Sequence, residues 1–206
     1  MCVRHGADIL GFVVEYPRPV PWNVRAEAAK ELMEAVSEPA KTCLVTGGTP
    51  EKVIKLALQI RPNYIQLHCG ESLEDTLSIL DNVKKYGSKV IKTLFPHMPD
   101  LEKTAKNFSA AGVDALLLDP RTPDNPVGKG AANLAAYAKL QAAASCPVIL
   151  AGGITPENVK ELVLQTEAPI IDLMTGVERS PGMKDAAKVM AFFQALQECG
   201  GCKAVS

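Results

Sequence analysis

The sequence has no run of apolar residues that approaches the roughly 20 needed to cross a membrane. Its first residues, MCVRHGAD, also lack the apolar core of a secretory signal. Neither sign of charge is in excess, because 22 Lys and Arg against 23 Asp and Glu leave a net charge of −1. The chain therefore has no basic field with which to attract nucleic acid or an anionic membrane surface. We predict a cytoplasmic protein whose partner is a small molecule.

The six cysteines do not have the spacing of a metal or disulfide framework. They are scattered, mostly within or beside apolar runs, as is typical of reduced and partly buried thiols. Cys199 and Cys202 do have C-x-x-C spacing, but this lone pair lies in a Gly-rich tail, and a structural zinc normally needs four ligands. We therefore expect no metal site.

Short apolar segments alternate with longer amphipathic ones along the whole chain, which has 206 residues, 47% of them hydrophobic. This composition and length predict one globular domain over residues 1–206. Near-continuous apolar strands separated by helices indicate a parallel sheet covered on both faces. The predicted strands start near Ala7, Lys41, Asn63, Lys89, Val113, Pro147 and Pro169.

The amphipathic segments predict helices at residues 24–36, 51–60, 73–86, 100–111, 131–144, 156–165 and 185–198. In the first of these, the residues expected on one buried face are Ala28, Leu32, Ala35 and Val36. Thr49 and Pro50 supply an N-cap and a first-turn proline for the second helix. Residues 2–6 resemble the last turn of an earlier helix, with Gly6 as its C-terminal stop.

The number of predicted strands, seven, is one fewer than a closed (β/α)₈ barrel contains, and such barrels typically have roughly 250 residues. We therefore predict an α/β fold, a TIM barrel that lacks the first strand and most of the first helix. A doubly wound open sheet is the alternative architecture, in which a missing strand would not matter.

Glycines directly follow the last two predicted strands. Residues 147–153 read PVILAGG, and residues 168–176 read APIIDLMTG. A glycine lets the backbone turn sharply and leaves N–H groups available to an anion at the start of a helix. In a barrel, the loops after the seventh and eighth strands usually hold phosphate. Together the two loops predict a shared phosphate site, whereas the glycines of either loop alone could simply form a turn.

Motifs spread over essentially the whole chain resemble the phosphoribosylanthranilate isomerase family of tryptophan biosynthesis. They are ADILGFV (residues 7–13), PRPV (17–20), QLH (66–68), VIK (90–92), ALLLD (115–119), PVILAGGITPENV (147–159) and DLMTGVERSPGMKD (172–185). The last two are specific, and the others are weak singly. The resemblance implies a (β/α)₈ barrel, no metal or organic cofactor, and conversion of N-(5-phosphoribosyl)anthranilate to 1-(2-carboxyphenylamino)-1-deoxyribulose 5-phosphate.

The implied Amadori rearrangement needs an acid that protonates the furanose ring oxygen and a base that removes the C2′ proton. The resemblance assigns the acid to Asp119, whose alternative role is to cap the following loop. The family's base is a cysteine in a Lys-x-Cys-Gly motif on the first strand, which this chain lacks. Cys43 follows Lys41 and Thr42 as a cysteine does in that motif. It stands on a later strand, however, and Leu44 takes the place of the glycine, so we expect a core thiol there. Cys69 is a weaker candidate near the mouth.

The resemblance also implies residues that bind the substrate. Arg18 matches the arginine that meets the anthranilate carboxylate, a role suited to a bidentate guanidinium; its alternative role is a surface ion pair. The phosphate would be held through N–H groups and one hydroxyl by Gly152, Gly153, Thr175 and Gly176. His68 would line the mouth or be a structural histidine. The family's Gly-Thr-Gly loop reads PRTPDNPVGKG here, at residues 120–130.

Two alternative functions remain open from the sequence. The first is a catalytically inactive barrel that binds a phosphate ligand. The second is another phosphosugar barrel enzyme, such as indoleglycerol-phosphate synthase. The assembly is expected to be a monomer or a homodimer.

Overall fold

The computed structural model describes residues 1–36, 38–120 and 133–199. All seven predicted strands are present there and form one parallel sheet in chain order. They are β1 (Ile9–Val13), β2 (Lys41–Thr46), β3 (Tyr64–Leu67), β4 (Lys89–Leu94), β5 (Ala115–Leu118), β6 (Val148–Ala151) and β7 (Ile170–Asp172).

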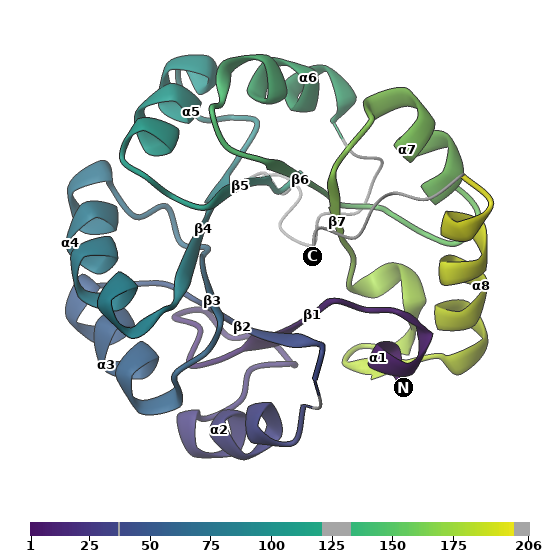
Figure 1. The fold of residues 1–206 in the computed structure, drawn as a ribbon, viewed down its shortest axis with the longest axis horizontal. Coiled ribbons are helices and arrows are strands. Elements are labelled where there is room, and N and C mark those ends of the chain that lie inside the picture. Colours follow the sequence, from purple (N-terminus) through teal and green to yellow (C-terminus); the bar gives the residue numbers. More distant parts are fainter. Residues whose placement is uncertain (37, 121–132, 200–206) are drawn as a thin grey trace.

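The order of the strands distinguishes the two predicted architectures. Each strand pairs in parallel with the next along the chain, and the sheet curls into a ring with the helices on its outside (Figure 1). A doubly wound sheet would reverse its strand order at a switch point and carry helices on both faces. The barrel prediction is thus confirmed, and the doubly wound alternative is wrong. β1 and β7 are the two edges, and no pairing joins them within the described residues.

The helices form where the amphipathic segments predict them. They are α1 (Cys2–His5), α2 (Ala26–Glu34), α3 (Pro50–Ile60), α4 (Leu73–Val83), α5 (Leu101–Ala110), α6 (Leu134–Ala143), α7 (Val159–Thr166) and α8 (Ala186–Gln197). Thr49 caps α3 by accepting a hydrogen bond from the Lys52 N–H, and Pro50 occupies its first turn. Gly6 ends α1 with φ of 109°, a left-handed conformation that suits glycine. None of these helices is both long and apolar enough to span a bilayer in the described part of the chain.

Two details of the helix predictions are wrong. The buried face of α2 consists of Ala26, Ala29 and Met33, whereas Leu32 is 48% exposed. Small alanines on both faces of this helix made the periodicity ambiguous, and packing against the sheet selects the face with Ala26, Ala29 and Met33. Helix α7 begins after Asn158 rather than at Pro156, because the Asn158 side chain bonds backbone groups of the preceding turn instead.

The core has two layers, one on each face of the curled sheet. Between strands and helices, the outer layer includes Leu44, Ile65, Leu116 and Leu150, each at most 1% exposed. The inner face packs against itself through small and branched side chains: Cys43, Ile91, Ala115, Leu117, Ile149 and Ala151. Helices therefore cover only one face, and side chains of the strands themselves fill the other, as in barrels generally.

Candidate active site

Parallel pairing places the carboxyl ends of all the strands at one end of the sheet, so the loops that follow them meet there. Asp119 directly follows β5, His68 directly follows β3, and Tyr16 lies shortly after β1. Although Tyr16 and Asp119 are 52 and 51 positions from His68 in the chain, the three residues form one hydrogen-bonded group.

His68 lies at the centre of this group. Its Nε2 is 3.0 Å from Oδ2 of Asp119, and its Nδ1 is 3.2 Å from the hydroxyl of Tyr16. The same hydroxyl donates to the backbone carbonyl of His68 at 3.2 Å. Phe95 packs edge-on against the imidazole, with ring centroids 5.8 Å apart. Both ring nitrogens therefore have polar partners while an aromatic ring fixes the plane of the ring.

The group is shielded from water but stands at the mouth. His68 is 4% exposed and Asp119 is 8% exposed. A carboxylate in such surroundings is costly to bury unless hydrogen bonds stabilise its charge. An arrangement of this kind can hold a proton at Asp119 and return it through His68.

The first glycine turn lies against the residue that follows Asp119. Gly152 has φ of 92°, and a Cβ built on it would overlap the ring of Pro120. Only glycine allows this approach, so the turn after β6 sits directly beside the end of β5.

The second glycine turn packs on the first. A Cβ built on Gly176 would overlap the carbonyl oxygen of Ile154, a backbone atom two residues beyond Gly152. Thr175 and Gly176 open a short 3-10 turn, η2 (Thr175–Val177). The turns after β6 and β7 are therefore in contact with each other, and the first of them contacts Pro120, the residue after Asp119.

Backbone donors on these turns are available to a ligand. Within the described residues, no hydrogen bond occupies the N–H groups of Gly153 and Gly176. Asn158 holds the first turn in shape, since its side chain accepts from the Thr155 N–H at 2.8 Å and donates to the Gly153 carbonyl at 2.8 Å. Two such N–H groups beside a threonine hydroxyl are suited to a phosphate.

A lysine supports the second turn from the side of the hairpin formed by β8 (Glu178–Ser180) and β9 (Met183–Lys184), which the sequence reading did not predict. The Lys184 ammonium donates to the Met174 carbonyl at 2.7 Å and pairs with Glu178 at 2.8 Å. The hairpin thereby fixes the backbone immediately before Thr175.

Arg18 is exposed on the connection from β1 to α2, outside the hydrogen-bonded group. Its positive charge acts on the Cys69 thiol and opposes the rise in that group's pKa, so the guanidinium lies toward the same end of the barrel.

The two cysteines considered as bases are both neutral thiols in this environment. Cys43 lies in the middle of β2 within the inner layer, where burial first and the Asp172 carboxylate second raise its pKa. Cys69 is half-buried at the mouth, and burial raises its pKa as well, against the opposing hydrogen bond from Tyr16. Burial is the largest influence on the pKa of both thiols, and around Cys69 the Glu71 carboxylate opposes the positive charges of Lys52 and Arg18, so neither thiol is activated as a base.

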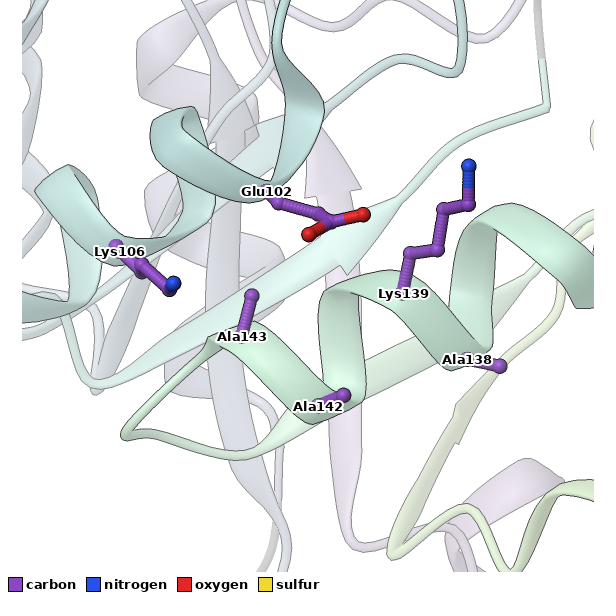
Figure 2. A pocket seen from close by; sticks show the side chains of 6 residues that line it. All are labelled: Glu102, Lys106, Ala138, Lys139, Ala142 and Ala143. Atoms are coloured by element: carbon purple, nitrogen blue, oxygen red, sulfur yellow. The ribbon is translucent and has the colours of Figure 1, made fainter.

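Two hollows are lined mainly by side chains of the helices. One, of about 340 Å³, is on the outer surface between α5 and α6, where Glu102, Lys106 and Lys139 project from the helices beside three alanines (Figure 2). The other, of about 360 Å³, is lined by charged side chains of α2 and α3 together with Glu15. Most of the loop predicted at residues 120–130, with its Gly128 and Gly130, and Cys202 lie outside the described residues.

Sequence reasoning missed Tyr16, Phe95 and a buried ion pair between Glu71 and Lys92. Tyr16 stands two residues before Arg18, but nothing local shows that its hydroxyl reaches a histidine 52 residues away. An available signal was the lysine of the VIK motif, since a lysine in an otherwise apolar strand needs a buried counter-ion.

Comparison with known proteins places these features in a family. A family model described as N-(5′-phosphoribosyl)anthranilate (PRA) isomerase matches residues 10–195. The isomerase of that name from Halobacterium salinarum is 35% identical over 199 residues, which cover 92% of this chain and 86% of that protein.

Solved structures have the same fold. The phosphoribosyl anthranilate isomerase of Thermus thermophilus is 30% identical with a TM-score of 0.79, over 96% of this chain and 91% of that one. Another isomerase, with reduced 1-(o-carboxyphenylamino)-1-deoxyribulose 5-phosphate bound, is 24% identical with a TM-score of 0.77 over the same shares, and this likeness concerns the fold alone. The chain belongs to the N-(5′-phosphoribosyl)anthranilate isomerase family, whose members catalyse an Amadori rearrangement in tryptophan biosynthesis.

Proposed function

We propose that this chain isomerises N-(5-phosphoribosyl)anthranilate to 1-(2-carboxyphenylamino)-1-deoxyribulose 5-phosphate, with Asp119 as the general acid. The observation that carries the proposal is the contact between Asp119 and His68 at the end of β5, directly beside the paired glycine turns. A sugar phosphate held at those turns has its ribose within reach of the carboxyl group.

In the first step, the Asp119 proton moves to the furanose ring oxygen. The bond from C1′ to that oxygen breaks, and the nitrogen lone pair forms the C=N bond of a protonated Schiff base. Asp119 is left as a carboxylate, which His68 stabilises through its Nε2 at 3.0 Å. Proton transfer by a positioned group of this type contributes about 10²- to 10⁴-fold to a rate.

In the second step, a base removes the C2′ proton, and the electron pair forms the enolamine that becomes the ketone. Among the described residues, no thiol is placed and activated for this role, because Cys43 is buried in mid-strand and burial raises the pKa of Cys69. This observation favours a second candidate function, a barrel that binds the phosphorylated ligand without turnover.

The binding groups follow from the same geometry. The phosphate is assigned to the N–H groups of Gly152, Gly153 and Gly176 and to the Thr175 hydroxyl, because the two turns are in contact. The anthranilate carboxylate is assigned to Arg18, whose guanidinium extends from the loop after β1 toward the same end. The ligand is thus a phosphoribosyl small molecule, and the described site contains no cluster of three or more metal-ligating side chains.

Binding and turnover separate the two candidate functions. We expect calorimetry to detect binding of reduced 1-(o-carboxyphenylamino)-1-deoxyribulose 5-phosphate, with affinity lowered about tenfold or more in Arg18→Ala, because one charge-assisted contact is lost. The fluorescence of the anthranilate substrate reports turnover in the same buffer. Binding with turnover supports the isomerase, and binding without turnover supports the non-catalytic barrel. If the chain neither turns over the substrate nor binds the natural product or the reduced compound, the isomerase and the non-catalytic barrel are both excluded.

Within the described residues, β1 and β7 are the two edges of the sheet, which bears on assembly. Edge strands present backbone N–H and C=O groups that can pair with another chain, so we expect self-association from monomer to homodimer as concentration rises. Sedimentation equilibrium between low and high micromolar concentrations measures this. A single monomeric mass at every concentration would contradict the prediction.

A further inference from the structure

A carboxylate and an ammonium group are buried together just below the mouth, outside the hydrogen-bonded group of His68. The Glu71 and Lys92 side chains are 1% and 0% exposed, and their charged atoms are 2.7 Å apart. Lys92 lies on the outer face of β4 with its ammonium 5.4 Å from the Phe108 ring centroid. Burial lowers the pKa of this ammonium, and the Glu71 carboxylate opposes the fall. Such a pair is costly to bury, and often no more stable than an apolar pair of similar volume.

Glu71 also holds the turns that follow two strands. Its Oε1 accepts a hydrogen bond from the Cys69 N–H at 3.1 Å and another from the Gly48 N–H at 3.3 Å. The carboxylate therefore joins the turn after β2, the turn after β3 and, through Lys92, strand β4. With one partner removed, the remaining buried charge would lose the counter-ion that now lies 2.7 Å away.

The packing around this carboxylate is tight. A Cβ built on Gly47 would overlap both Glu71 Oε1 and the Cys69 side chain, so the turn after β2 closes directly over them. Lys52 fixes the same turn from the other side, since its ammonium donates to the carbonyl oxygens of Gly47 and Glu15. Glu15 immediately precedes Tyr16, so the turns after β1, β2 and β3 are held together.

His68 stands between these fixed points. Its N–H donates to the Thr46 carbonyl at 2.9 Å, and the next residue, Cys69, is bonded to Glu71. The imidazole has little freedom to move while the backbone N–H groups of His68 and Cys69 are both held. We propose that Glu71 and Lys92 are positioning residues for the acid: their buried ion pair fixes the turn after β3 so that His68 stays in contact with Asp119.

The inference rests on the proposed role of Asp119, but its chief test does not require turnover. The chain has three histidines, so the ring ¹⁵N signals of His68 can be assigned by comparison with His68→Gln. The test variant combines Glu71→Leu with Lys92→Met, which replaces the pair by apolar groups of similar volume. We expect this variant to fold, to lose the hydrogen-bonded ring signals of His68, and to lose about tenfold to a hundredfold in kcat with little change in KM.

Two further variants keep the inference falsifiable. Glu71→Gln with Lys92→Met retains an acceptor for the Cys69 N–H and should recover part of the His68 signal, which also serves if the Leu and Met variant does not fold. The matched control is Glu198→Gln with Lys160→Met, an ion pair in which the Lys160 side chain is 50% exposed and the Glu198 side chain 58% exposed. His68 signals and kcat that stay unchanged in a folded variant at the buried pair would overturn the proposal. Altered His68 signals in a variant at the buried pair, together with normal turnover in Asp119→Asn, would instead refute the role of Asp119 as the acid. The role of the buried pair in positioning His68 would remain.

Discussion

Asp119→Asn is expected to lower kcat/KM for the isomerisation by at least about a hundredfold, because the amide cannot donate the proton that opens the furanose ring. Asparagine has the same shape and keeps an oxygen 3.0 Å from His68 Nε2, so the fold should be preserved. The measurement is the loss of substrate fluorescence under single-turnover and steady-state conditions. Affinity for reduced 1-(o-carboxyphenylamino)-1-deoxyribulose 5-phosphate should change far less than the rate.

Asp81→Asn is the matched control, since Asp81 is exposed on α4 and the same chemical change there should have no effect. Turnover within a few-fold of the unaltered chain in Asp119→Asn would remove Asp119 from the mechanism. If the unaltered chain binds the ligand without turnover, Asp119→Asn has no rate to lower. The second prediction, which concerns ligand affinity, then applies.

Gly176→Ala is expected to weaken binding of the phosphorylated ligand by about tenfold to a hundredfold, as expected for loss of one hydrogen bond to a charged group. The added Cβ would overlap the Ile154 carbonyl oxygen, and a backbone atom cannot move aside without shifting the neighbouring turn. The two turns would separate, and their N–H groups would no longer point at one phosphate. Calorimetry with the reduced product, and competition by inorganic phosphate, measure the loss.

Gly87→Ala provides the control for this change. Gly87 has φ of 83° with open space around a built Cβ, and it ends the turn after α4, away from the glycine turns. Its substitution should lower the melting temperature through backbone strain while leaving ligand affinity unaltered. If Gly176→Ala binds as tightly as Gly87→Ala does, the phosphate does not sit at the contact between the turns.

Local patterns in the sequence were sufficient for most of the fold. The seven strands were predictable because each is a short apolar run between breaks, and β2 and β4 begin at Lys41 and Lys89 as predicted. The cap at Thr49 was predictable because side-chain capping involves residues three positions apart. The face of α2 was not, because alanines lie on both of its sides and packing against the sheet, rather than periodicity, selected Ala26, Ala29 and Met33.

Candidate site residues divide in the same way. Asp119 and the two glycine turns could be placed at one end of the barrel because every parallel strand points its carboxyl end there. The partners of His68 could not, because Tyr16 and Asp119 reach it from strands 51 to 52 residues away in the chain. Nor could the bonds from Glu71 to Lys92 and Gly48, which join the turn after β3 to strand β4 and to the turn after β2.

The amino-acid sequence by itself determined the alternation of strands and helices, the carboxyl that ends β5, and the family to which the chain is similar. These depend on residue type and spacing within short segments, where each residue's neighbours are known. The tertiary structure alone decided which polar groups meet at the mouth and which charges are buried beneath it. The curl and stagger of the sheet set those distances, and a small shift in either would bring different side chains together.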